Sequence, residues 1–167
     1  HELALIDFKQ KLIATTKTMD CVNLPVVGCM RYAIMVNCIA LADSMAKAFK
    51  VQDKRLWRVK VNALAESGNW DVLEDFGDKK SPIGYSPFVE ACMVNHNMRE
   101  AQHFVEKISD TEERMRCAMK WQLHETAIKC ATKLKDIDTL MRICGESRVE
   151  TVKNHAKEAI ALIEGSK

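Results

Sequence analysis

The 167-residue sequence predicts an all-α fold, an α-solenoid built from stacked antiparallel helical hairpins. Apolar residues recur three and four positions apart along most of the chain, which is the spacing of one helical face. The connectors between these segments are short, and a sequence pattern returns after roughly 26–28 residues, the length of one helix–turn–helix unit. No convincing run alternates apolar and polar residues as a half-buried strand would.

Seven segments carry the apolar helical spacing, and two further helix starts have their own signals. In chain order the segments are 5–12, 27–34, 39–49, 57–65, 101–108, 123–134 and 149–163. Ser86 precedes Pro87, and we expect the serine to cap a helix whose first turn holds the proline, where its missing N–H costs nothing. Ser109 and Glu112 have the spacing of a capping box, which predicts another helix start.

Short polar connectors join the predicted helices, at Gly68-Asn69, Asn95–Asn97, Ser109–Thr111 and Lys135-Asp136. Connectors of this length force consecutive helices to lie antiparallel. The repeat aligns residues 69–76 with 97–104 and with 123–127, and one such unit is too small to bury its own apolar face, so successive units must stack. We therefore expect one α-solenoid domain over residues 1–167, with the irregular stretch 77–85 as a loop inside the stack.

Composition excludes several classes of partner. The 25 basic and 23 acidic residues are spread along the chain and give a net charge of +2, with no extended basic tract for a phosphate backbone, so we expect no nucleic-acid partner. No run approaches the ~20 apolar residues needed to cross a bilayer, so any membrane role is expected to be indirect. The chain opens at His1 inside an amphipathic pattern, which is typical of a fragment of a longer protein.

Reactive side chains form no recognisable catalytic or metal motif. The seven cysteines make no CxxC pair, and we interpret them as reduced core thiols of a cytosolic protein. His96 and His103 are seven residues apart without a metal-binding spacing. Cys117 and His124 could be imagined as a nucleophile and base, but nothing supplies an oxyanion hole. The sequence thus predicts no metal, no cofactor and no enzyme.

The remaining candidates for function are surface residues. The three tryptophans are expected to fill gaps between helices, with a partner-facing anchor as the alternative. Arg55, Arg58 and Asn62, spaced by three and four, lie on one face of a predicted helix; Lys54 adjoins them, and Lys47 closes the preceding helix. This basic face is either simply solvated or an interface, because arginine presents a rigid fork suited to pairing with carboxylates.

Four ordered motifs carry a resemblance to a known family. Asp53–Trp57, Asn69–Leu73, Lys79–Tyr85 and Pro87–Cys92 resemble the C-terminal region of the vacuolar protein sorting subunit sixteen family, with the match specific over roughly residues 24–108 and looser beyond. The segments Lys120–Glu125 and Lys135–Asp138 depart from the family tail and are similar to an animal paralogue that pairs with a second version of subunit thirty-three. The resemblance leaves open which complex the chain serves, HOPS and CORVET or that of the paralogue.

The resemblance implies a non-catalytic scaffold subunit of an endosomal, lysosomal or vacuolar tethering complex. Such a subunit recruits a Sec1/Munc18-family protein, subunit thirty-three, for SNARE-mediated fusion and contacts other tethering subunits; it is cytoplasmic and peripheral on late endosome, lysosome or vacuole membranes. Arg55 carries over by direct match as an interface residue, while Lys54, Arg58 and Lys47 are added from helical geometry. Residues 1–76 are then the partner-binding half and 85–167 the continuing stack. The alternative is a generic helical-repeat scaffold that self-assembles through methionine-rich edges or binds other coat or tether subunits.

Overall fold

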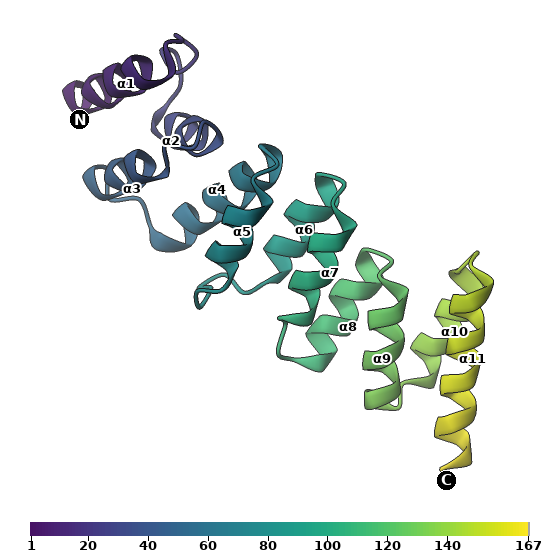
Figure 1. Ribbon diagram of the computed structural model, residues 1–167. Helices are drawn as coiled ribbons and strands as arrows, with labels where there is room; N and C mark the ends of the chain where they lie inside the picture. The colour runs from purple at the N-terminus through teal and green to yellow at the C-terminus, as the bar shows by residue number, and fades with distance from the viewer. Residues whose placement is uncertain (167) are drawn as a thin grey trace. The chain divides into compact units, whose positions relative to one another are not determined.

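The computed structural model describes residues 1–166, and within them every regular element is an α-helix (Figure 1). The helices form two compact units, of which the first is His1–Asn97 and the second begins at Met98. The prediction of an all-α solenoid of helical hairpins is confirmed. No helix in this described part of the chain is both long enough and apolar enough to cross a membrane.

The first unit contains six helices. They are α1 (Glu2–Thr16), α2 (Val26–Met35), α3 (Ile39–Ala48), α4 (Asp53–Glu66), α5 (Trp70–Gly77) and α6 (Ser86–Val94). α2 packs on α1, α3 and α4, and α4 packs in turn on α5 and α6. Because α4 has neighbours on both sides, its apolar residues Val61 and Leu64 are completely buried.

An aromatic cluster joins α4, α5 and α6 inside the first unit. The Trp57 ring stacks on Phe76 with centroids 4.0 Å apart, and Phe88, which is completely buried, lies 6.2 Å from Phe76 and 5.4 Å from Tyr85. The Tyr85 hydroxyl donates to the carbonyl oxygens of Gly77 at 2.9 Å and of Lys79 at 3.1 Å. These bonds fasten the loop between α5 and α6 to the cluster, so the loop lies within the stack as predicted.

The second unit contains the remaining five helices. They are α7 (Met98–Glu106), α8 (Thr111–Lys120), α9 (His124–Leu134), α10 (Ile137–Glu146) and α11 (Glu150–Gly165). α8 packs on α7 and α9, and α9, α10 and α11 pack on one another (Figure 1). Its core is contributed by all five helices, and its largest fully buried side chains are Phe104, Leu140 and Ile143.

The predicted repeat is confirmed by the positions at which alternate helices begin. α5, α7, α9 and α11 start at Trp70, Met98, His124 and Glu150, which are 28, 26 and 26 residues apart.

A recurring backbone turn closes several of the helices. A residue with positive φ follows the helix at three of these ends: Gly68, Gln122 and Lys135. The N–H of the residue after each one donates to the carbonyl oxygen five residues before that donor, at 2.8–2.9 Å. This is the Schellman geometry, which satisfies carbonyl groups left over at a helix end. The same turn explains why connectors of two or three residues suffice.

Two predicted helix caps are wrong by one residue. α8 is capped by Asp110, whose Oδ1 accepts hydrogen bonds from the N–H groups of Glu112 at 2.8 Å and Glu113 at 3.3 Å, and not by Ser109. Ser86 is the first residue of α6 rather than its cap, although Pro87 does lie in the first turn as predicted. At α8 the aspartate next to the predicted serine makes the capping hydrogen bonds, whereas at α6 the residue before Ser86, Tyr85, makes no side-chain cap hydrogen bond.

Asp136 caps α10, and the capping hydrogen bonds also affect the acidity of its carboxyl group. Its carboxylate accepts hydrogen bonds from the Thr139 hydroxyl at 2.7 Å and from the Thr139 N–H at 3.0 Å. These bonds, the hydroxyl bond first, lower the pKa of Asp136 below its usual value because they favour the ionised carboxylate.

None of the seven cysteines forms a disulfide within residues 1–166, and five of them are buried. Burial raises the pKa of the Cys29 and Cys130 thiols, because an apolar surrounding disfavours the thiolate. The tryptophans differ from the prediction: Trp57, Trp70 and Trp121 are half-buried rather than enclosed in the core.

Candidate partner-binding surface

The exposed side of α4 carries the basic residues singled out from the sequence. Lys54, Arg55, Arg58 and Asn62 are all exposed, whereas Val61 on the same helix is completely buried. The three-and-four spacing therefore divides the helix as expected, with the side chains of one face in solvent and those of the other in the core. We call Lys54, Arg55 and Arg58 the α4 basic face.

A fourth cation of the same helix has a different role that sequence reasoning missed. The Lys60 side chain is only 12% exposed; its Nζ lies 2.6 Å from Asp43 Oδ1 of α3 and 5.2 Å from the centre of the Phe76 ring. Lys60 lies four residues before the buried Leu64 and therefore on the same side of α4. This spacing is the feature of the sequence that could have indicated a largely buried position for Lys60. This ion pair links α4 to α3, so the side of α4 opposite the basic face is fixed to a neighbouring helix.

Next to the α4 basic face lies a hollow of about 540 Å³ between α4 and α6. Arg58, Asn62 and Glu66 line it from α4, and Glu90 and the exposed Val94 line it from α6. Glu66 also pairs with Arg31 of α2. The hollow thus combines one arginine and two carboxylates with several apolar side chains, a mixture suited to a protein surface rather than to a small ligand.

Lys47 lies at a different hollow from Arg58. Lys47 lines a depression of about 360 Å³ between the end of α3 and the start of α4, together with Lys50, Asp53 and Leu56. Lys47 is exposed, as predicted, but it borders the α3 side of α4 while Arg58 borders the α6 side. A partner that contacts both residues must therefore cover the N-terminal turns of α4.

The candidates for metal binding and catalysis gain no support from geometry. Among residues 1–166 no group of three or more His, Cys, Asp or Glu side chains is placed to hold a metal ion. His96 occupies the turn after α6 with φ +60°, and His103 lies on α7, a helix of the second unit. Cys117 is buried in α8, and His124 begins α9 with its Nδ1 buried.

Taken together, the stacked helical hairpins place the chain in the class of α-solenoid segments. The chain belongs to the family described as "Vps16, C-terminal region", whose sequence model matches residues 2–163. The resemblance inferred from the four motifs is thereby confirmed, and it extends over the part of the chain that looked divergent.

Individual relatives carry names from vacuolar protein sorting. The chain is 28% identical over 93% of its length to the vacuolar protein sorting-associated protein 16 homolog of Drosophila melanogaster, and 34% identical over 76% to the homolog of Dictyostelium discoideum. It is 32% identical over 79% of its length to protein VACUOLELESS1 of Arabidopsis thaliana. The chain spans 19%, 16% and 16% of these proteins, respectively.

Proposed function

We propose that the chain is a non-catalytic scaffold segment of an endosomal, lysosomal or vacuolar membrane-tethering complex. In this proposal its first unit recruits a Sec1/Munc18-family protein, subunit thirty-three or its paralogue, for SNARE-mediated fusion, and the stack contacts other tethering subunits. The site of action is the cytoplasmic side of late endosome, lysosome or vacuole membranes. Membership in the Vps16 C-terminal family is the basis for this reading.

The observation that supports the placement of the interface is the exposure of the α4 basic face on an anchored helix. Arg55 and Arg58 lie in solvent, while Val61, Leu64 and the Lys60–Asp43 ion pair hold the helix from behind. A partner therefore meets side chains on a backbone that is already ordered. The backbone of α4 consequently loses little conformational entropy when the partner binds. Arginine forks of this kind pair bidentately with carboxylates, so the partner surface is expected to be acidic.

The test is a binding titration of the 167-residue chain against each of the two versions of the Sec1/Munc18 subunit. Arg55→Glu should weaken binding by about 2–5 kcal/mol if the arginine is desolvated and paired, because reversal leaves a carboxylate facing a carboxylate. Arg116→Glu is the matched control, since Arg116 is an exposed arginine of α8 in the second unit. Which version binds the unaltered chain would identify the complex.

Two outcomes would overturn the proposal at different levels. Equal binding by Arg55→Glu and Arg116→Glu would show that the interface lies away from Arg55. Failure of the chain to bind either version would remove the recruiting role from this segment. If the chain binds and Arg55→Glu weakens that binding, Lys47→Glu measures how far the interface extends, because Lys47 borders the α3 side of α4.

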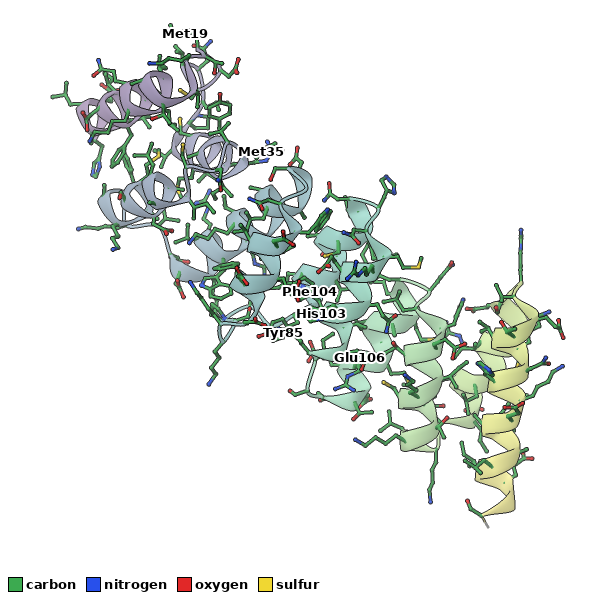
Figure 2. All side chains as sticks on the ribbon, viewed as in Figure 1. Met19, Met35, Tyr85, His103, Phe104 and Glu106 are labelled. Carbon is green, nitrogen blue, oxygen red and sulfur yellow. The ribbon has the colours of Figure 1, made fainter. Side chains whose placement is uncertain are left out.

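Exposed methionines favour a second candidate, a scaffold that self-assembles or binds other coat-like subunits. Met19 lies in the loop after α1 (Figure 2). It is 67% exposed, and Met98 and Met141 of the second unit are 62% and 60% exposed. Methionine is adaptable and is used at permissive binding surfaces. Light scattering over a range of concentrations separates the two candidates, because recruitment predicts a monomer and self-assembly predicts a mass that rises with concentration.

A further inference from the structure

A small hollow in the second unit gathers three cations from α8 and α9. Its volume is about 90 Å³, and its lining includes Arg114 of α8 and Lys129 and Lys133 of α9. The hydroxyl-bearing side chains Thr111 and Thr126 also line it, as do Cys130 and Glu106, the latter on the last turn of α7 (Figure 2). We call this lining the α8–α9 cation pocket.

Partly buried hydrogen bonds fix one wall of the α8–α9 cation pocket. Thr126 is almost completely buried; its Oγ1 accepts a hydrogen bond from Gln102 Nε2 at 2.5 Å and donates one to Glu106 Oε1 at 3.2 Å. Arg114 is positioned separately, because its Nε donates to the carbonyl oxygen of Ile108 at 2.7 Å. The wall is therefore preorganised, which lowers the entropic cost of binding a ligand there.

The charges of the pocket do not cancel. Three lining residues are cationic and Glu106 is the only acidic one among those described, and its Oε2 lies 3.8 Å from Arg114 Nη1, a long separation for an ion pair. Lys129 and Lys133 are four residues apart on one helix, a spacing at which like charges repel. An anion between them would relieve that repulsion.

The same charges converge on one buried atom. Burial raises the pKa of the Cys130 thiol, and Arg114, Lys133 and Lys129 oppose that shift while Glu106 adds to it. Cys130 lines the pocket together with these four charged residues.

We propose that the α8–α9 cation pocket binds the phosphate group of a phosphoserine or phosphothreonine in a partner segment. A phosphate monoester carries about −1.5 to −2 charge at pH 7, which matches the surplus of three cations over one carboxylate. An arginine with neighbouring lysines is a recurrent way to recognise such a group. The small volume admits a phosphate on a slender side-chain stem but gives an inositol ring no room inside, so a phosphopeptide is favoured over a lipid headgroup.

This inference does not depend on the α4 basic face, because every residue of the pocket belongs to the second unit. A negative result in the Sec1/Munc18 titration therefore leaves it intact, and its own failure leaves the proposed recruitment intact.

The test titrates the 167-residue chain with an alanine pentapeptide that carries one central phosphoserine, followed by two-dimensional amide NMR. Inorganic phosphate, the unphosphorylated peptide and vesicles containing a phosphoinositide are titrated in parallel. We expect saturable shifts at Thr111, Arg114 and Lys129 with the phosphopeptide and none with the unphosphorylated peptide. The phosphopeptide should also raise the melting temperature, because it binds the folded state only.

A pair of double variants makes the result specific. Lys129→Gln combined with Lys133→Gln should weaken phosphopeptide binding at least tenfold. Lys120→Gln combined with Lys157→Gln, which removes the same charge from exposed positions of α8 and α11, should leave binding within twofold.

Equal weakening by the two double variants would refute the proposal, since binding would then follow net charge alone. Saturation by inorganic phosphate without binding of the phosphopeptide would mean an adventitious ion only. Binding to vesicles without binding of the phosphopeptide would assign the pocket to a lipid and overturn the proposal, as would the absence of any saturable shift.

Discussion

Removal of the Phe88 ring should destabilise the first unit far more than a substitution on its surface. Phe88 is completely buried, and its ring lies 5.4 Å from Tyr85, 6.2 Å from Phe76 and 6.4 Å from Trp57. Replacing a buried phenylalanine with alanine costs about 3–5 kcal/mol, a range that already includes the lost side-chain contacts. Because Phe88 has three aromatic neighbours, we expect Phe88→Ala to fall in the upper part of that range and to lower the free energy of unfolding by about 4–5 kcal/mol.

The assay is urea unfolding of the chain followed by circular dichroism, with hydrogen exchange measured by mass spectrometry. Two units need not unfold together, so a single transition cannot be assumed. Exchange resolves this, because loss of protection should be confined to the helices of the first unit and leave α8–α11 protected. Phe8→Ala is the matched control: Phe8 is half-buried, and its ring lies 6.1 Å from Phe49, away from this cluster, so about 1 kcal/mol is expected.

A loss of less than about 2 kcal/mol for Phe88→Ala, or a loss no larger than that for Phe8→Ala, would refute the aromatic cluster as the core that joins α4, α5 and α6. Equal loss of protection in both units would instead refute the division of the chain into separately packed units.

The caps and turns allow two further predictions, both measurable by thermal melts. Asp110→Ala should cost about 1 kcal/mol, because the Asp110 carboxylate accepts two N–H groups of α8, while Ser109→Ala should be close to neutral; the reverse ranking would restore Ser109 as the cap. Gly68→Ala should cost about 1 kcal/mol from backbone strain alone, since φ is +69° and an added Cβ meets nothing nearer than Trp70 Nε1 at 3.9 Å. Gln122→Gly, at φ +56°, should stabilise by about 0.5 kcal/mol, and effects of the same sign at these two positions would contradict the argument.

The helical hairpins could be predicted because their determinants are local. Apolar spacing depends only on the helix period, and the positive-φ turns favour the polar or glycine residues that stand at Gly68, His96, Gln122 and Lys135. The repeat found α5 from its likeness to α7, although α5 has only eight residues.

The start of α8 shows where local information ends. Ser109 with Glu112 and Asp110 with Glu113 both have the spacing of a capping box, so the sequence permits two registers one residue apart. The register observed buries Met115, Cys117 and Ala118. The capping-box spacing alone therefore does not choose between the two starts, and the structure uses Asp110.

The proposed interface was predictable in part for the same reason. Helical geometry alone placed Arg55, Arg58 and Lys54 on an exposed face, and the structure has them exposed. The position of Lys47 relative to α4 depends on how residues 49–52 turn the chain between α3 and α4, which is a tertiary property. Their role in binding a partner, like the division of the chain into a partner-binding half 1–76 and a continuing stack 85–167, stays a prediction.

The two kinds of cation on α4 show why a basic helix cannot be assigned to an interface from charge alone. Lys60 is 12% exposed and pairs with Asp43, so reversing its charge would place two carboxylates in a partly desolvated contact and disturb α3 and α4 together. Loss of partner binding in such a variant would say nothing about the interface. Arg55 lies in solvent on the opposite side of the same helix, so its charge can be reversed at little cost to folding. Binding and folding are separable at Arg55 and inseparable at Lys60, and only the first kind of residue can report where a partner docks.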